Sequence, residues 1–268
     1  MRRLRTGNTI EPVVRQFYQR SIDVLNDANV PFLVGGAYAI ELYTGHIRKT
    51  KDFDVFVMKD DVEKALEAFR QAGFESEFTF PHWLGKVYQG DKFVDVIFSS
   101  GNGVAPVDEV WFENARKAIL FGRVVPVSPP EESLWSKAFI MERERYDGAD
   151  VAHLLYATAE ELDWHRLIQR FGPHWRVLYA HLTLFGYIYP GRRDTIPAWV
   201  MRALTDRISS EINDDPLPVD VCRGTVLSRA QYLGDVEKHE LIDGRLVPFG
   251  VMTPEEVEAW TEAIGKEK

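Results

Sequence analysis

Cysteine is almost absent from this sequence: Cys222 stands alone among 268 residues. A single thiol excludes a framework of internal disulfides and is typical of a reducing compartment, so we expect a cytoplasmic protein. Long apolar runs are missing too, since none approaches the roughly 20 residues that a membrane-spanning helix needs. The first residues, MRRLRTGN, are basic but lack the apolar centre of a signal peptide. The composition therefore predicts a soluble protein with no membrane partner.

Basic residues are fewer than acidic ones, 32 against 41, which gives a formal net charge of -9. An acidic protein gains little non-specific attraction to a polyanion, so general binding to DNA or RNA is disfavoured. The same acidity suits a cationic ligand, although acidic surfaces also serve solubility alone. A chain of 268 residues is long enough for one large or two moderate domains.

Apolar runs and turn residues divide the first 127 residues into short elements. Strand patterns lie at residues 31–34, 52–57, 74–80, 83–88 and 92–98, and helical patterns at 11–28, 37–43 and 60–72. Residues 118–120 and 123–127 predict a hairpin around Phe121-Gly122. We therefore expect an α/β domain with a mixed sheet over residues 1–127.

The segment Ser128-Pro129-Pro130 predicts a domain boundary, because proline ends the strand and is favourable at the start of a helix. Beyond it the pattern is helical at residues 131–145, 149–157, 163–171, 174–185 and 196–212. This part is dense in aromatic residues, which we interpret as a helical core. They are Trp164, Phe171, Trp175, Tyr179, Phe185, Tyr187 and Tyr189. The fold class expected is α/β (α+β), with a helical domain over residues 128–268.

A glycine pair, Gly35-Gly36, joins the first short strand to the helical pattern that follows it. Glycines at a strand-to-helix turn let backbone N–H groups approach an anion, and the helix N-terminus adds favourable dipole charge. Gly-Gly also makes ordinary tight turns. By itself the pair leaves both interpretations open.

Asp52 and Asp54 begin the next strand pattern. Strand side chains alternate between faces, so the two carboxylates project together while Phe53 points to the other side. Adjacent carboxylates repel one another unless a cation lies between them, and Mg²⁺ is a natural candidate because it prefers oxygen ligands. Asp95 lies within the apolar run at residues 92–98, where a carboxylate is costly unless it is paired or metal-bound.

In this order, the glycine turn and the three aspartates resemble the nucleotidyltransferase superfamily related to DNA polymerase beta. The resemblance rests on FLVGGA at residues 32–37, RKTKDFDV at residues 48–55 and VDV at residues 94–96. It covers residues 31 to 98. Bacterial branches of this superfamily include aminoglycoside adenylyltransferases and abortive-infection toxins.

Carried over by position, the resemblance implies that Asp52 and Asp54 ligate two Mg²⁺ ions. Asp95 would ligate one of these ions and help to deprotonate the acceptor hydroxyl. Gly35 and Gly36 would hold the triphosphate. Two metal ions can clamp the attacking and leaving oxygens of an in-line displacement at phosphorus.

The residues around these motifs add further expectations. Arg48 and Thr50 fit the family pattern and are expected to bind the nucleotide, whereas Lys49 and Lys51 belong to a solvated loop. Many relatives place serine or threonine after the second glycine. Here the next residue is Ala37, so the resemblance implies that backbone groups alone bind the phosphates at this turn.

In the helical part, related enzymes carry a lysine after the strand domain and an arginine-rich stretch further on. By that resemblance Lys137 contacts the nucleotide phosphates from across the cleft, which the helical domain closes. The alternative is that Lys137 only extends its stem along an apolar surface. By the same resemblance Asp147 or Asp150 orients Lys137 or caps the next helix. For Asp150 we favour the N-cap, and we expect Arg143 and Arg145 to form salt bridges with neighbouring acids.

The activity implied is Mg²⁺-dependent transfer of a nucleoside monophosphate from an NTP, expected to be ATP, to a hydroxyl, with release of pyrophosphate. The acceptor is a small molecule or a macromolecule. Two alternatives stay open: a toxin-like enzyme that acts on tRNA or protein, and a catalytically silent relative that binds nucleotide or a partner protein. Retention of three aspartates argues against silence, because buried charges are costly to keep.

Overall fold

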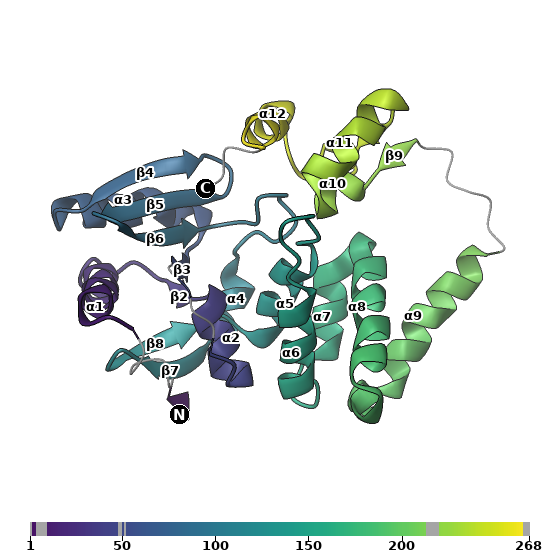
Figure 1. Ribbon diagram of the computed structural model, residues 1–268, viewed down its shortest axis with the longest axis horizontal. Helices are drawn as coiled ribbons and strands as arrows, with labels where there is room; N and C mark the ends of the chain where they lie inside the picture. The colour runs from purple at the N-terminus through teal and green to yellow at the C-terminus, as the bar shows by residue number, and fades with distance from the viewer. Residues whose placement is uncertain (1, 4–9, 48–49, 51, 213–219, 265–268) are drawn as a thin grey trace. The chain divides into compact units, whose positions relative to one another are not determined.

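The computed structural model describes residues 2–3, 10–47, 50, 52–212 and 220–264 of the chain (Figure 1). The chain divides into two compact units. The first extends to Pro129 and includes Glu258–Ala263, and the second covers Pro130–Val257. Segment 258–263, which we expected in the second domain, therefore belongs to the first unit.

A mixed sheet forms the first unit, as predicted. In the described residues it has eight strands, in the order β1-β7-β8-β2-β3-β6-β5-β4. They are β1 (Arg2–Arg3), β2 (Leu33–Val34), β3 (Asp52–Phe56), β4 (Glu75–Phe80), β5 (Leu84–Gln89), β6 (Lys92–Ile97), β7 (Arg116–Leu120) and β8 (Arg123–Val127). β2 is antiparallel to β3, and β3 is parallel to β6. The glycine pair and the three aspartates thus lie on or next to three adjoining strands.

Two helices, α1 (Pro12–Asp27) and α3 (Val62–Gln71), pack against the sheet and bury their apolar stripes. Tyr18 of α1 lies 4.8 Å from Phe53 of β3, measured between ring centroids. Phe53, Val55 and Val94 are fully buried. Because strand residues alternate, α1 covers the face opposite to that of Asp52 and Asp54.

The hairpin β7–β8 is confirmed as the sequence predicts it. Phe121 and Gly122 have positive φ values of 51° and 80°. A two-residue turn of this kind matches the twist of the flanking strands. A short helix between β6 and β7, α4 (Glu109–Glu113), has no counterpart in the expected elements, and the Asp108 carboxylate caps it by accepting from the Val110 N–H at 3.1 Å.

The described part of the first unit is completed by α2 (Gly36–Thr44), the 3-10 turn η2 (Lys59–Asp61) and the late segment Glu258–Ala263. This segment includes Trp260, in the final turns of α12 (Pro254–Glu262). Its ring centroid lies 4.9 Å from that of Phe80 and 5.2 Å from that of Trp83. A Cβ at Gly101 would come within 2.5 Å of the indole, so glycine permits this contact.

Helices dominate the second unit, where the described residues also form one small parallel pair of strands. The helices are α5 (Pro130–Ala138), α6 (Gly148–Thr158), α7 (Trp164–Phe171), α8 (Trp175–Ile188), α9 (Ala198–Glu211), α10 (Gly224–Leu227) and α11 (Arg229–Lys238), with 3-10 turns η3 (Gly172–His174) and η4 (Pro190–Thr195). The strands are β9 (Val221–Cys222) and β10 (Ile242–Asp243). None of the helices in the described ranges is long and apolar enough to cross a membrane.

The expected helix over residues 131–145 is wrong in its second half, because α5 ends at Ala138. The chain then forms a loop in which Met141 bridges to Tyr146 and the Asp147 N–H donates to the Ile140 carbonyl at 3.1 Å. The charged run at residues 142–145, Glu-Arg-Glu-Arg, has helix-forming residues but no apolar side chain that could pack against the core. The loop instead places Asp147 beside Lys137 of α5.

Aromatic packing in this unit follows the prediction in part. Trp164, Phe171, Trp175 and Phe185 are buried in the helical core. Tyr187 is 84% exposed, so its assignment to the core is wrong. Ion pairs also join α5 to α7: the Glu131–Arg166 pair measures 2.6 Å between nitrogen and oxygen.

Candidate functional site

The three predicted aspartates lie on one face of the sheet. Asp54 of β3 and Asp95 of β6 are register partners on neighbouring parallel strands, so their side chains project from the same face. Asp52 is two residues before Asp54 and shares that face. All three are half-buried. We call this surface, made by Asp52, Asp54 and Asp95, the acidic face.

The glycine turn lies directly against the acidic face. The Gly35 N–H donates to the Asp54 backbone carbonyl at 2.9 Å. Gly36 has a φ of +54°, and a Cβ built on it would lie 1.5 Å from Asp54 Oδ2. A Cβ on Gly35 would meet the Phe56 ring at 2.0 Å. No side chain fits at either position unless neighbouring groups move.

Helix α2 begins at this turn, with Gly35 as its N-cap residue and no side-chain cap. At the N-terminal end of α2, the Ala39 N–H donates a hydrogen bond to the Gly35 carbonyl at 3.1 Å. The N–H groups of Gly36, Ala37 and Tyr38 come before it and have no carbonyl partner within the helix. Because the Gly35 N–H is engaged with β3, these three groups are the backbone donors that the turn offers to an anion.

Thr50 organises the entry to β3. Its hydroxyl accepts from the Asp52 N–H at 3.1 Å and lies 3.3 Å from the Asp52 carbonyl oxygen. A side chain that bonds its own backbone two residues on fixes the local turn. Arg48, expected to bind nucleotide, lies outside the described residues, as do Lys49 and Lys51.

Lys86 of β5 is a residue of the acidic face that sequence reasoning missed. Its Nζ lies 3.3 Å from Asp95 Oδ1 and 4.4 Å from the centroid of the Phe93 ring. Lys86 is the register partner of Asp95 on the antiparallel strand β5. The available signal was its position as the single charged residue in the strand pattern at residues 83–88.

Two buried phenols experience the charge of the acidic face. Burial is the main cause of the raised pKa of Tyr18, and the Asp52, Asp54 and Asp95 charges raise it further. Tyr38 also has a raised pKa, first from burial and then from neighbours that include Asp54 and Asp52. Both phenols therefore stay protonated and neutral beneath the aspartates.

The chemistry of the acidic face suits a hard divalent cation. Its donors are carboxylate oxygens, the ligands that Mg²⁺ prefers, and it already holds one cation, the Lys86 ammonium. In the part of the chain that the structure describes, no three acidic, histidine or cysteine side chains are arranged as a ready-made ion site. Oxygens from a substrate would therefore be needed to complete a coordination shell around an ion at these aspartates.

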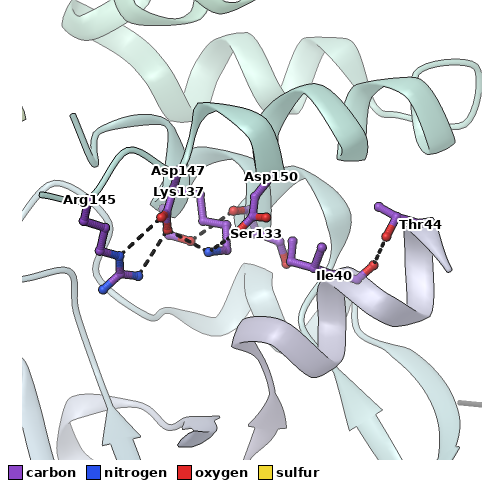
Figure 2. Close-up of polar contacts among 8 residues, drawn as sticks. Ile40, Thr44, Ser133, Lys137, Arg145, Asp147 and Asp150 are labelled. Carbon is purple, nitrogen blue, oxygen red and sulfur yellow. Dashed lines mark hydrogen bonds and ion pairs between the residues drawn. The ribbon is translucent and has the colours of Figure 1, made fainter. Parts of the chain in front are cut away.

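Lys137 lies in a buried ionic cluster of the second unit (Figure 2). Its Nζ is 2.8 Å from Asp147 Oδ2 and 2.9 Å from Asp150 Oδ2. Arg145 donates to Asp147 from the other side, through Nε at 3.2 Å and a terminal guanidinium nitrogen at 3.1 Å. The Asp147 side chain is only 2% exposed. Contact between Lys137 and a nucleotide stays a prediction.

The cluster corrects one expectation and confirms another. Asp150 is not the N-cap of α6: Asp147 occupies that position, and Asp150 lies inside the first turn. Burial acts to raise the pKa of Asp147, but the Lys137 ammonium and the Arg145 guanidinium outweigh it and lower that pKa below its ordinary value. Salt bridges of Arg143 and Arg145 to neighbouring acids are confirmed, with Glu144 and Asp147 as the partners.

Residues 19–174 match the model of a protein family described as uncharacterised nucleotidyltransferase. The match extends over more than half of the chain and contains the glycine turn, the three aspartates and the Lys137 cluster. Among curated proteins, none matches the chain.

Several solved structures are similar to the chain at low sequence identity. The antibiotic-resistance factor ANT(2'')-Ia is 15% identical with a TM-score of 0.45, over 66% of this chain and 99% of its own. The lincosamide antibiotic adenylyltransferase LnuA is 15% identical with a TM-score of 0.38, over 54% of this chain and 96% of its own. An antigenic nucleotidyltransferase-like protein from Paracoccidioides brasiliensis is 13% identical with a TM-score of 0.41, over 68% and 91%.

Gly36→Ala tests the contact between the turn and the acidic face. The new methyl group would be strained at positive φ and would displace the Asp54 carboxylate, so we expect a loss of more than about 2 kcal/mol in the free energy of unfolding. The measurement is urea unfolding followed by tryptophan fluorescence.

Gly45→Ala is the matched control, because Gly45 ends the same helix at a φ of 72° with no atom within 4 Å of the new Cβ. The Gly45→Ala variant introduces backbone strain without a steric clash, so its free energy of unfolding should fall by about 1 kcal/mol. Equal losses in the two variants would show that Gly36 is needed only for its backbone conformation.

Asp147→Asn tests the buried cluster. It leaves the Lys137 ammonium short of one carboxylate, so we expect it to cost about 3 kcal/mol of stability at pH 7. Because the folded-state pKa of Asp147 is lowered, its contribution is complete above the ordinary carboxyl pKa of about 4 and is lost as the pH falls through the lowered value.

The measurement is urea unfolding of both proteins between pH 7 and pH 2.5, and the difference between them should shrink below about pH 4. Glu144→Gln is the control, since its ion pair with Arg143 is exposed and should matter by less than about 0.5 kcal/mol. A difference between wild type and Asp147→Asn that is constant over this pH range would contradict the account.

Proposed function

Because the chain belongs to the family of uncharacterised nucleotidyltransferases, we propose that it transfers AMP from ATP to a hydroxyl group and releases pyrophosphate in a Mg²⁺-dependent reaction. The observation that carries this proposal is the packing of the Gly36 backbone against the Asp54 carboxylate. It brings anion-binding N–H groups and a carboxylate face into direct contact. A phosphate chain with its counter-ion requires both kinds of group side by side.

The triphosphate is bound by the backbone of the glycine turn. The N–H groups of Gly36 and Ala37 bind phosphate oxygens, and the positive end of the α2 dipole favours the negative charge. Gly35 has a different role. Without a side chain it lets the turn pack against Phe56 of β3, and its position sets that of Gly36. Thr50 contributes through the entry to β3, and a nucleotide contact of its hydroxyl belongs to the same proposal.

The acidic face is the metal-binding surface. Asp52 and Asp54 hold Mg²⁺, and Asp95 joins them and accepts the proton of the acceptor hydroxyl. When bound, Mg²⁺ supplies charge neutralisation for the phosphates and the leaving pyrophosphate. The hydroxyl oxygen then forms a bond to the α-phosphorus as the bond from that phosphorus to pyrophosphate breaks.

The acceptor is a hydroxyl-bearing molecule whose own charge is compatible with binding to an acidic protein. With a net charge of -9, the chain gains little of the non-specific attraction to a polyanion that general nucleic-acid binding uses. A cationic or neutral small molecule therefore suits it better than a long polyanion. A contact of Lys137 with the nucleotide belongs to the same proposal; its ammonium already pairs with two carboxylates, Asp147 and Asp150, and has three N–H donors.

Asp52→Asn and Asp54→Asn test the proposal. Each removes one negative charge from the acidic face with little change of shape, so we expect turnover to fall by at least about 1,000-fold. The measurement is release of pyrophosphate from ATP with Mg²⁺, with an aminoglycoside, a lincosamide or tRNA offered as the acceptor.

Asp60→Asn is the matched control, because Asp60 is an exposed acid of η2 a few residues beyond β3. Its turnover should equal that of the wild type. Full turnover in Asp54→Asn would rule out the proposed chemistry, and so would equal loss in all three variants.

A further inference from the structure

Strand register places Lys86 on the acidic face. β5 runs antiparallel to β6 and pairs Lys86 with Asp95 and Val87 with Val94. Val87 and Val94 are fully buried on the opposite face of the sheet. The alternation therefore directs Lys86 to the side of the aspartates rather than into the core.

The ammonium group of Lys86 lies between two groups of this face. Asp95 Oδ1 is 3.3 Å away, and the Phe93 ring centroid is 4.4 Å away. Phe93 is in turn the register partner of Asp52. The side chains of Lys86 and Asp95 are 24% and 16% exposed, so solvent screens this pair only in part.

We propose that Lys86 is the resident counter-ion of the acidic face and that a divalent cation must displace it from Asp95. This inference rests on the proposed function, in which Asp95 is a metal ligand. Two cations at one carboxylate oxygen repel each other, so occupation by the lysine weakens the binding of free metal. A metal that arrives with a triphosphate gains further ligands, and the displacement then becomes favourable. Lys86 is thus a positioning residue that couples metal binding to nucleotide binding.

Lys92 provides a matched comparison on the same pair of strands. It is three residues before Asp95 on β6, an odd spacing that puts it on the opposite face. Its ammonium pairs with Asp91, which is 90% exposed, at 2.8 Å. Lys86→Gln and Lys92→Gln therefore remove the same charge from nearly the same place in the sequence, but only the first removes it from the acidic face.

The experiment is a titration of the full-length protein with MnCl₂ without nucleotide, in which electron paramagnetic resonance measures free Mn²⁺. Lys86→Gln should bind Mn²⁺ about three- to tenfold more tightly than the wild type, as expected for loss of a partly screened ion pair. Lys86→Arg keeps the charge and should bind like the wild type. Lys92→Gln should stay within about twofold, because its ammonium lies on the opposite face of the sheet and pairs with the exposed carboxylate of Asp91. Thermal unfolding without metal verifies that each variant folds.

The outcomes separate this inference from the proposed function. Equal or weaker Mn²⁺ binding by Lys86→Gln overturns the inference, and it leaves the function standing if Asp54→Asn still abolishes binding. Tightening in Lys86→Arg as large as in Lys86→Gln also overturns it, since charge would then be irrelevant. Binding that is absent from both wild type and Lys86→Gln, or that ignores Asp54→Asn, overturns the inference together with the proposed metal site.

Discussion

The close approach of the Gly36 backbone to the Asp54 carboxylate is the contact on which the arrangement of the first unit's polar residues depends. It requires a positive φ and the absence of a Cβ, and only glycine meets both conditions. The contact joins the end of β2, the start of α2 and the middle of β3 at one point. Backbone donors and carboxylate acceptors are thereby held together without any long side chain.

Part of the charge on the acidic face is offset by a lysine on a neighbouring strand, Lys86 of β5. Asp54 and Asp95 are brought side by side by strand pairing, and the same pairing rule brings Lys86 to Asp95 from the other edge. Beneath them the raised pKa values of Tyr18 and Tyr38 keep the phenols neutral, so these rings add bulk and no charge. Like charges held together in this way are costly without a cation, and the lysine supplies one.

Short-range patterns predicted the central part of this arrangement, and long-range contacts limited the rest. Alternation in residues 52–57 was enough to place Asp52 and Asp54 on one face, and the Phe121-Gly122 turn was readable from two residues. Lys86 was missed because its partner depends on the register between two strands. The end of α5 was misplaced because the loop after Ala138 is fixed by the pairing of Asp147 with Lys137. The return of Trp260 to Phe80 has no local signal at all.

The central claim is that the glycine turn and the acidic face together form one site for a nucleotide with its metal. The most direct test is calorimetric titration of ATP into the wild type and into the Asp52→Asn/Asp54→Asn double variant, each with and without Mg²⁺. The account predicts binding to the wild type with Mg²⁺, and a large loss of affinity when either the ion or the aspartates are removed. ATP binding that is unaffected by both changes, or no binding of any of the four NTPs to the wild type, would contradict it.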